Sequence, residues 1–476
     1  MVDPSDALVS ELTSIVGVEA VRSGDLDRHL YSKDAGVARG DVSVVVLPKT
    51  ARQVAAIVRT AVSHGVAVVP RGAGTGLTGG AVPEGAAILL VTTRMDQVDV
   101  DAANRTAWVG PGVINLDLSN QTASLGIHFA PDPSSQAACT IGGNVANNSG
   151  GPHCLAEGST VNHVLAVEFV TAAGEIVVAG SGAPDPSGLD VRGVMVGSEG
   201  TLGIITRILV KLIPNPPAVR TLLLAFPEVR GAAATVTDVI ASGVVPAALE
   251  MMDRPLIQAV ENFVHADLPV DAAAVLLAEV VGHEAGVDVE AELIERIAAD
   301  NGAFQLRRAA DADERELLWK ARKSSFGAIA QIAPNYYLHD TVIPRTKLVE
   351  VLEQIYEIAE RRNLVVLNTI HAGDGNLHPL FAFDANDPAV VVQVNEAADE
   401  IVEISIAAGG VLSGEHGIGL EKRDLMHLVF SPVDLDAQAR LREAFDPEAT
   451  MNPRKVLPAG ARCFDFGRPI PEGAWV

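Results

Sequence analysis

Cysteine is scarce in this chain: Cys139, Cys154 and Cys463 are the three cysteines among 476 residues. Their number is odd and no two have the CxxC spacing, so the sequence predicts neither a disulfide framework nor an iron–sulfur cluster. Basic residues are also outnumbered, 35 against 60 acidic ones, which leaves a net charge of −25. This charge repels nucleic acid and anionic lipid surfaces, so no nucleic-acid partner is expected.

Long apolar runs are missing as well. No segment reaches the roughly 18 apolar residues that a membrane-spanning helix needs, and the first residues contain neither a basic n-region nor an apolar core. We therefore expect a cytoplasmic protein that becomes peripheral to a membrane only through a partner. Hydrophobic residues make up 48% of the chain, and its length exceeds what one core supports, so two or more globular domains are expected.

Two histidines lie at a predicted strand reversal in the C-terminal half. The apolar, β-branched run Leu364–Ile370 predicts a buried strand. Ala-Gly-Asp-Gly-Asn comes directly after His371 and has the composition of a turn, so His378 should lie on the neighbouring strand end. One histidine at a strand end is more often a core or hydrogen-bonding residue than a ligand. The pair therefore indicates a functional site only if further ligand-type side chains accompany it.

A second segment has the same composition. After the short apolar run at Val411, Gly414 and Gly417 bracket Glu415 and His416, which lets the backbone turn sharply and expose both side chains. Two imidazoles and one carboxylate can hold a divalent metal with open positions, which leaves the last histidine available as an acid or base. Three histidines and a glutamate on two glycine-rich turns are difficult to explain as structure alone.

The N-terminal region predicts a β-α-β unit, with strand Val42–Leu47, helix Thr50–Ser63 and strand Val66–Val69. The loop Pro70–Gly80 comes next, and its residues 74–79 match the GxGxxG spacing of dinucleotide sites. A Rossmann site needs a helix that starts inside these glycines, whereas the next segment, Ala87–Thr93, predicts a strand. We therefore reject a Rossmann fold and interpret the loop, with Arg71, as a backbone nest for phosphates. A wide turn without a ligand is the alternative.

Further segments have unusual compositions. Pro131–Ser135 and Cys139–Gly151 are too polar and glycine-rich for core elements, and their small and amide side chains suit packing against a flat, hydrogen-bonding ligand. Pro214–Pro217 predicts a domain boundary. The alternating strands and helices after it predict a split β-α-β sheet with helices on one face. That region includes a helix over Asp311–Ile332 and a strand over Tyr336–Ile343.

Three motifs together resemble one family: Pro-Arg-Gly-Ala-Gly-Thr-Gly-Leu-Thr-Gly-Gly from Pro70, Gly-Gly-Asn-Val-Ala-Asn-Asn-Ser-Gly-Gly from Gly142, and His371–His378 with Gly414–Gly417. They resemble the FAD-linked 2-hydroxyacid dehydrogenases of the vanillyl-alcohol oxidase/p-cresol methylhydroxylase superfamily, of the glycolate oxidase FAD subunit, D-lactate dehydrogenase and D-2-hydroxyglutarate dehydrogenase types. The resemblance implies an α+β fold. A two-lobed FAD-binding domain of the p-cresol methylhydroxylase type would cover residues 1–217, a ferredoxin-like antiparallel-sheet cap domain residues 218–460, and a C-terminal tail residues 461–476.

The same resemblance implies which residues contact FAD. The superfamily commonly attaches its flavin through a histidine in the first glycine loop, and because this loop has none, the FAD is expected to be non-covalent. The expected contacts are Pro70, Arg71, Gly72, Ala73, Gly74, Thr75, Gly76, Gly79, Gly80, Pro131, Asp132, Pro133, Ser134, Gly142, Gly143, Asn144, Ala146, Asn147, Asn148, Gly200, Ile205 and Asn452.

In the cap domain, the resemblance implies that His371, His378 and Glu415 bind a divalent metal, with zinc favoured, and that His416 is the catalytic base. A metal on the substrate α-hydroxyl and carboxylate would lower the hydroxyl pKa, His416 would take its proton, and the Cα hydride would pass to the flavin. Arg322 stands where the family has the arginine that binds the substrate carboxylate, a role that suits its bidentate fork.

Two positions favour D-lactate or glycolate as the substrate. Hydroxyglutarate-type members tend to have Asn where this chain has Leu380, and Lys where it has Leu338, so no cation is evident for a second carboxylate. D-2-hydroxyglutarate, another alcohol oxidised by an FAD oxidase, a zinc hydrolase and a non-catalytic redox subunit are the alternatives. The electron acceptor stays open among a quinone, a cytochrome, an electron-transfer flavoprotein and an iron–sulfur subunit, and a homodimer is one expected assembly.

Overall fold

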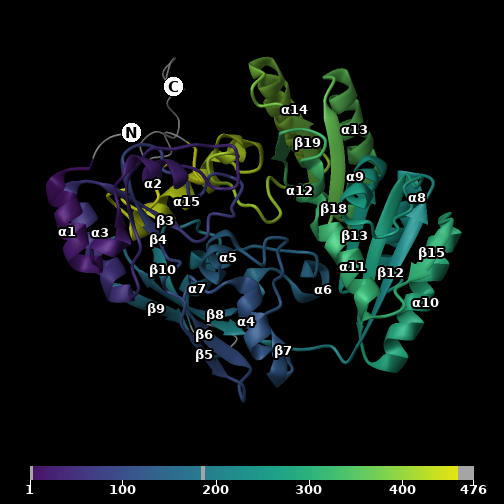
Figure 1. The fold of residues 1–476 in the computed structure, drawn as a ribbon, viewed down its shortest axis with the longest axis horizontal. Coiled ribbons are helices and arrows are strands. Elements are labelled where there is room, and N and C mark those ends of the chain that lie inside the picture. The colour runs from purple at the N-terminus through teal and green to yellow at the C-terminus, as the bar shows by residue number, and fades with distance from the viewer. Residues whose placement is uncertain (1–3, 184–187, 459–476) are drawn as a thin grey trace. The chain divides into compact units, whose positions relative to one another are not determined.

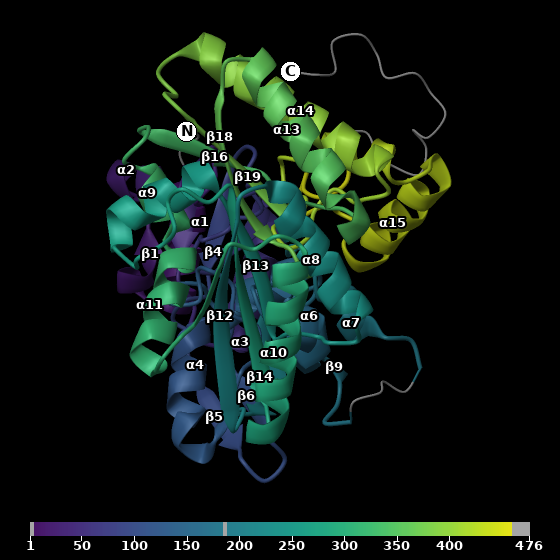
Figure 2. The same cartoon turned by 90° about the vertical axis from the view of Figure 1, so that its right-hand side faces the viewer.

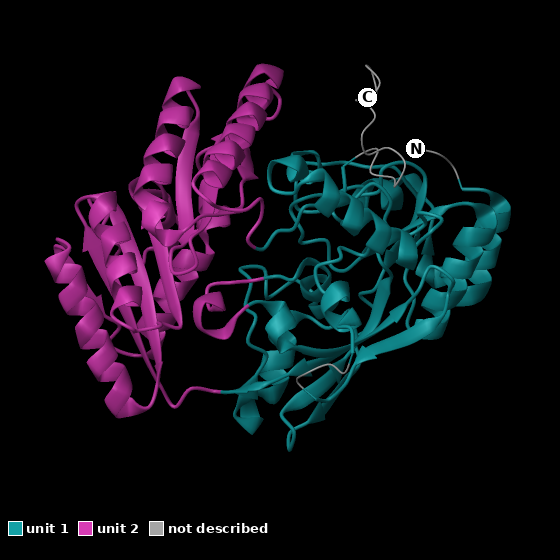
Figure 3. Cartoon of the chain, turned by 180° about the vertical axis from the view of Figure 1, so that it is seen from behind, with its two compact units in different colours: residues 1–149, 159–214, 415–476 teal, residues 150–158, 215–414 magenta. Residues whose placement is uncertain are grey.

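The computed structural model describes residues 4–183 and 188–458, which form two compact units (Figure 1, Figure 3). Unit 1 contains residues 1–149, 159–214 and 415–476, and unit 2 contains residues 150–158 and 215–414. Cys463 and the expected tail over 461–476 lie outside the described residues. The boundary expected at 217 nearly coincides with the end of the second segment of unit 1.

A four-stranded sheet lies in unit 1, with the strand order β1 (Val21–Arg22), β2 (Val42–Val46), β4 (Ala87–Val91), β3 (Ala67–Arg71). Strands β2 and β3 both pair with β4 in parallel, and β2 and β4 are buried throughout, as parallel strands usually are. Helices α1 (Asp6–Val16) and α3 (Ala51–His64) pack their apolar side chains into the same core. The predicted β-α-β unit is present.

Helix α3 shows how local sequence sets the bounds of an element. Thr50 Oγ1 accepts a hydrogen bond from Gln53 N at 3.2 Å and caps the first turn, and Gly65 ends the helix with a left-handed φ of 63°. The short helix α2 (Asp25–Leu30) precedes β2. The 3₁₀ helices of the described chain are η1 (Val18–Ala20), η2 (Ala123–Leu125), η3 (Thr160–His163), η4 (Arg345–Lys347) and η5 (Arg423–Leu428).

The second sheet of unit 1 is antiparallel, with the order β5 (Val98–Asp101), β6 (Thr106–Val109), β10 (Ile204–Lys211), β8 (Val164–Val170), β9 (Ile176–Gly180). It shares a core with α4 (Asn115–Thr122), α5 (Ile141–Asn147) and α7 (Val191–Met195). A further pair joins β7 (Ile127–His128) to β11 (Ile213–Pro214). Each sheet has a core of its own, and Val170 and Ile204 of the second sheet also reach the core of the first. The two sheets match the two-lobed architecture that the resemblance implies.

Helix α5 corrects one expectation, because it lies in the segment that we judged too glycine-rich for a core element. Thr140 Oγ1 caps the helix by accepting from Gly143 N at 3.3 Å. Gly142 has to be glycine, since a Cβ there would lie 2.4 Å from the Cβ of Pro111. The small residues therefore allow close packing of a short helix.

Residues from 415 onward group with unit 1, although we expected them in the cap domain up to residue 460. The chain there includes α15 (Pro432–Phe445), after which Met451 pairs with Val68 of β3 and Asn452 N donates to the Val68 carbonyl at 2.8 Å. These backbone bonds attach the C-terminal segment to the four-stranded sheet. No short-range pattern in the sequence specifies such a pairing across the whole chain.

Unit 2 is built on one large antiparallel sheet, in which β17 (Thr341–Val342) pairs with β19 outside the main path. The main order is β15 (Gln305–Arg308), β12 (Ala218–Phe226), β14 (Ala274–Gly282), β13 (Ala248–Asp253), β18 (Val365–His371), β19 (Asn376–Phe383), β16 (Asn335–Leu338). The antiparallel cap sheet is thus confirmed. The expected strand over Tyr336–Ile343 is interrupted at His339 and Asp340, which separate β16 from β17.

Helices cover both faces of this sheet rather than one, as Figure 2 shows for α10 and α11 on either side of β12. One face shares a core with α8 (Val229–Ala241), α10 (Glu284–Asp300), α13 (Leu348–Arg361) and α14 (Pro388–Ala407). The other carries α9 (Arg254–Val264), α11 (Ala312–Lys323) and α12 (Ser325–Ile329). Trp319 of α11 donates a hydrogen bond to Glu279 of β14 at 2.7 Å. Ala278 and Val280 precede and follow Glu279 on that strand and point to the first face, so Glu279 and α11 lie on the other. The expected helix over Asp311–Ile332 is broken at Ser324.

The short helix α6 (Cys154–Glu157) lies in residues 150–158 and belongs to unit 2. His153 precedes it and its Nε2 lies 3.4 Å from Glu279 Oε1 of β14. Across residues 4–183 and 188–458, no helix has the length and apolar character needed to cross a membrane.

Candidate active site

The glycine-rich loop after β3 is in contact with the other segments predicted to hold FAD. A Cβ at Gly72 would lie 2.4 Å from Thr140 Oγ1, and a Cβ at Gly200 would lie 2.3 Å from Pro70 Cγ. Asn452 Nδ2 donates to the carbonyls of Gly80 and Glu199 at 2.8 and 2.7 Å. Segments far apart in sequence therefore meet within unit 1 at positions where a side chain would not fit.

Arg71 supports this loop through the contacts of its guanidinium group. Its Nη1 donates to the Lys33 carbonyl at 2.7 Å and its guanidinium lies 5.6 Å from the ring centre of Tyr31. A Cβ at Gly74, whose φ is +78°, would lie 1.9 Å from Arg71 Nη2. Burial lowers the pKa of Arg71, and the nearby Asp34 opposes this shift. Arg71 thus supports the turn that its neighbours form, and contact with a phosphate stays a prediction.

The amides of the second motif are largely engaged within the protein. Asn144 Oδ1 accepts from Asn115 Nδ2 at 2.9 Å, and Asn148 Oδ1 accepts from Val161 N at 2.8 Å. Asn147 Nδ2 donates to the carbonyl of His416 at 2.9 Å. These side chains connect loops of the protein to one another. Their expected contacts with FAD stay predictions, and such contacts would have to use backbone groups or the remaining side-chain donors.

The loops nevertheless fit a large polar cofactor. Asn452 Oδ1 and Lys455 Nζ are buried and have no hydrogen-bond partner among the described residues, and a buried polar atom left unpaired is costly. Together with the glycine positions at which no Cβ fits, these atoms indicate a binding surface whose polar groups are satisfied by a ligand. The remaining predicted contacts, among them the Pro131–Ser134 turn and Ile205, stay predictions.

In unit 2, the predicted reversal brings His371 and His378 together. Strands β18 and β19 pair His371 with Asn376 and Thr369 with His378, and the two imidazole centres lie 5.1 Å apart at an interplanar angle of 89°. Both side chains are buried. Gly375 makes the turn with a φ of +75°. The prediction of two imidazoles on neighbouring strands is correct in geometry.

A buried glutamate that sequence reasoning missed orients the first histidine. Glu250 of β13 stands opposite His371 in the register, and its Oε1 and Oε2 lie 2.8 and 2.9 Å from His371 Nδ1. Burial alone would raise the pKa of Glu250, but its interactions with His371 and Arg322 outweigh this effect, and the net pKa lies below its ordinary value. A histidine whose Nδ1 donates to a carboxylate presents Nε2 as its metal-binding atom, so this contact suits the predicted role of His371. The signal in the sequence is an acidic residue within an apolar strand.

Arg322 lies on α11, is 2% exposed, and places Nη2 2.5 Å from Glu250 Oε2. Its Nε has no hydrogen-bond partner among the described residues. Arg322 is therefore not a solvated surface arginine. Contact with a substrate carboxylate stays a prediction, and the same guanidinium now has a second task as counter-ion of Glu250.

The turn that carries the remaining candidates begins at Ser413 and Gly414. Asp340 accepts from Ser413 Oγ at 2.5 Å and from Gly414 N at 3.0 and 3.1 Å, so this carboxylate fixes the end of unit 2. Glu415 and His416 come directly after it in the chain. Asp340 is the second acidic residue that sequence reasoning left without a role.

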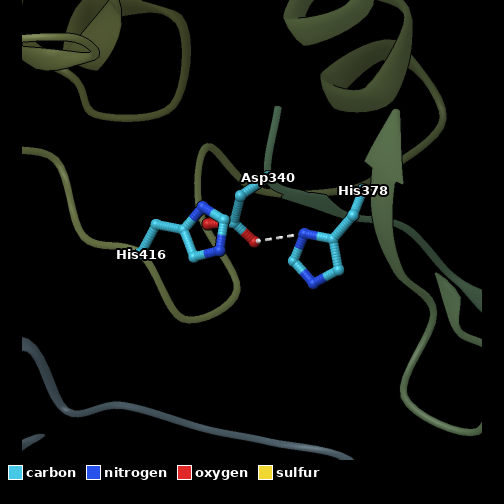
Figure 4. A group of neighbouring side chains, drawn as sticks. All are labelled: Asp340, His378 and His416. Carbon is cyan, nitrogen blue, oxygen red and sulfur yellow. Dashed lines mark ion pairs between the residues drawn. The ribbon is translucent and has the colours of Figure 1, made fainter. Parts of the chain in front are cut away.

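Among residues 4–183 and 188–458, two overlapping groups of side chains could hold one metal ion, each with its potential ligand atoms within 4.8 Å of one another. One is the predicted set His371, His378 and Glu415. The other is Asp340, His378 and His416 (Figure 4). In the second set, the Asp340 oxygens also accept from Ser413 and Gly414. Two imidazole nitrogens and a carboxylate oxygen suit zinc.

Comparisons with known proteins agree with this architecture. Residues 42–180 match the family "FAD binding domain" and residues 215–456 match "FAD linked oxidases, C-terminal domain". The chain is 45% identical over 425 residues to glycolate oxidase subunit GlcD of Escherichia coli (strain K12), covering 89% of this chain and 85% of that protein. It is 33% identical to D-lactate dehydrogenase of Archaeoglobus fulgidus, over 87% and 91% of the two chains.

The fold is also that of a solved structure. The p-cresol methylhydroxylase structure with substrate bound superposes with a TM-score of 0.81 at 16% identity, covering 95% of this chain and 96% of that one. The chain belongs to the family of FAD-linked oxidases. It is an FAD-linked oxidoreductase related to glycolate oxidase subunits and D-lactate dehydrogenases, and this relationship removes the zinc hydrolase alternative.

Proposed function

We propose that this enzyme oxidises a small D-2-hydroxyacid, with D-lactate or glycolate favoured, to the corresponding 2-oxoacid. The proposal is supported by the candidate metal-ligand set His371, His378 and Glu415, with His416 next to Glu415 in the chain, because a metal held there could chelate the hydroxyl and carboxylate of a 2-hydroxyacid. When bound, non-covalent FAD supplies the two-electron acceptor and a divalent cation, with zinc favoured, supplies the charge that lowers the hydroxyl pKa.

The chain's own residues would do the rest. His416 would take the proton of the substrate hydroxyl as general base. Arg322 would pair with the substrate carboxylate, since a planar guanidinium binds a carboxylate through two hydrogen bonds. Glu250 would hold His371 in one tautomer and orientation, as carboxylates behind metal-binding histidines do.

The preference for a monocarboxylate rests on a pair of leucines. Leu338 and Leu380 are direct partners across β16 and β19, and both are buried. Leu380 lies two residues beyond His378, so it shares that face of the strand. An apolar pair at this place offers no charge to a second carboxylate, which disfavours D-2-hydroxyglutarate.

The relatives suggest an assembly as well. Because a named relative is a glycolate oxidase subunit, we infer that this chain passes its electrons to a partner, with a quinone, a cytochrome, an electron-transfer flavoprotein or an iron–sulfur subunit as the candidate acceptors. A homodimer and a location in the cytoplasm or peripherally at the membrane, through that partner, complete the proposal.

The deciding experiment is an anaerobic absorbance spectrum before and after D-lactate, glycolate and D-2-hydroxyglutarate are added in turn. Loss of the flavin band at about 450 nm with one acid identifies that acid as a reductant of the flavin. Reduction by D-2-hydroxyglutarate alone would overturn the monocarboxylate preference. A flavin band that no 2-hydroxyacid bleaches would overturn the proposed reaction.

A further inference from the structure

A buried glutamate holds the segment just after the proposed base. Glu199 Oε1 accepts a hydrogen bond from Ile418 N at 2.7 Å, and its Oε2 accepts one from Gly419 N at 2.8 Å. Glu199 is 6% exposed and all three residues belong to unit 1. Because these amides lie two and three residues beyond His416 in the chain, the carboxylate controls the path of the backbone from which that imidazole projects.

We propose that Glu199 is a positioning residue for His416: it fixes the Gly417–Gly419 turn so that the imidazole stands where it can take the substrate proton, and Glu199 itself touches no substrate. The inference rests on the proposed function, in which His416 is the base. It deepens that function by adding a residue that acts only through the backbone of the base.

The other side of the turn is held as firmly. The His416 carbonyl accepts from Asn147 Nδ2 at 2.9 Å and from Thr78 Oγ1 at 3.2 Å. The Thr78 carbonyl in turn accepts from Leu420 N at 2.8 Å. The backbone on both sides of the Gly417–Gly419 turn is therefore hydrogen-bonded to side chains or carbonyls of the two glycine-rich motifs. Glu199 adds a carboxylate to these contacts with the turn.

Backbone conformation and packing both favour a specific role for the carboxylate. Glu199 has a φ of +50°, a left-handed conformation that is uncommon for a glutamate and that persists where the surroundings require it. A Cβ at Gly417 would lie 2.7 Å from Glu199 Oε1, so the turn can approach the carboxylate only with glycine at that position. A turn that merely filled space would need neither feature.

Burial and nearby charges act on Glu199 in opposite directions. Burial raises the pKa of Glu199 to about 7, against the opposing effect of the two amides and of Lys455 and Lys422. Both lysines are buried as well. A buried carboxylate is costly unless it is hydrogen-bonded and charge-compensated; two amides bond Glu199, and the lysines compensate its charge in part, since its pKa stays raised.

The test compares Glu199→Gln with the holoenzyme, using the acid that reduces the wild-type flavin. We expect the variant to keep FAD, judged by its absorbance, while the rate constant for anaerobic flavin reduction falls about 10- to 100-fold, the range expected when a reacting group is slightly displaced. The apparent Kd for the acid should change less than about threefold, because ground-state contacts are untouched. Hydrogen exchange at Ile418 and Gly419 should accelerate.

A matched control is Glu261→Gln. Glu261 also clamps a turn, accepting from Ala266 N and Leu268 N at 3.0 Å each, but that turn carries no site residue. The Glu261→Gln variant should exchange the amide hydrogens of Ala266 and Leu268 faster, without a change in the flavin reduction rate. If Glu199→Gln fails to fold, Thr78→Val removes a donor to the His416 carbonyl and tests the same turn, with a smaller loss in the same rate constant expected.

The outcomes separate the two proposals. A Glu199→Gln variant that is reduced at the wild-type rate, or that loses its FAD together with its activity, would overturn the positioning role and leave the proposed reaction intact. Wild-type protein that no 2-hydroxyacid reduces would overturn the proposed function and this inference with it. Faster exchange at Ile418 and Gly419 with a slower reduction rate at unchanged FAD content would support both.

Discussion

The substitution Glu250→Gln separates the metal site from the stability of the fold. The variant keeps the volume of the side chain but removes the charge that faces His371 Nδ1 at 2.8 and 2.9 Å and Arg322 at 2.5 Å. Loss of a carboxylate behind a metal-binding histidine typically weakens metal binding about 10- to 100-fold, which is about 1.4 to 2.7 kcal/mol. We expect that loss in a zinc competition titration.

The stability effect should be larger than the effect on metal binding. Arg322 is 2% exposed, and removing one partner of a buried ion pair costs about 3–5 kcal/mol, because an uncompensated charge is left behind. Urea denaturation of the metal-free protein should report this loss. In the double variant Glu250→Gln/Arg322→Met the buried charge is gone, so stability should largely recover while zinc affinity stays weak.

A surface pair provides the control for this experiment. Glu353 lies 3.1 Å from Arg230, and both side chains are more than half exposed. Glu353→Gln should change stability by less than about 1 kcal/mol and leave zinc affinity unchanged. A folded Glu250→Gln protein that binds zinc as tightly as the wild type would refute the reasoning, because the carboxylate would then not orient His371.

Three further outcomes are expected. His416→Ala should keep FAD but slow anaerobic flavin reduction by about 10²- to 10⁴-fold, and full activity would contradict its role as base. Gly200→Val should lower the bound FAD fraction and destabilise the fold by about 1–3 kcal/mol. The reason is that Gly200 has a φ of +72° and a Cβ there would lie 2.3 Å from Pro70 Cγ. Unchanged FAD content and stability would refute this. Burial raises the Glu199 pKa from 4.5 to about 7, so between these pH values the folded protein keeps a proton that the unfolded chain releases. The contribution of Glu199 protonation to the free energy of unfolding is therefore fully present below about pH 4.5 and is lost as the pH rises through about 7. Urea denaturation at several pH values should show this component in the wild type and not in Glu199→Gln.

Much of the fold and part of the site could be predicted from local sequence. The β-branched run before His371 and the Gly-Asp-Gly turn after it specify a strand and a tight reversal, and β18 and β19 form there. The GxGxxG loop was correctly separated from a Rossmann site because the next element is a strand, β4. In each case the relevant interactions lie within a few residues, so composition and periodicity carry the information.

Other elements depended on packing that no local pattern records. Helix α5 forms in a glycine-rich segment because Thr140 caps it and Gly142 lies against Pro111. The helix expected over Asp311–Ile332 breaks at Ser324, and the strand over Tyr336–Ile343 breaks where Asp340 turns towards Ser413 and Gly414. Propensity is a weak prior, and tertiary contacts overrode it here.

The sequence by itself determined the ligand types and the strand reversal, because two histidines flanking one turn, and a Glu-His pair between two glycines, specify which chemistry is available. Only the tertiary structure decided which buried charged side chains lie next to these candidate site residues. Glu250 and Arg322 are far apart in the chain and meet across β13 and α11, and Glu199 reaches the His416 turn from another motif altogether. A buried charge is stable only beside its partners, and those partners become neighbours when the sheets assemble.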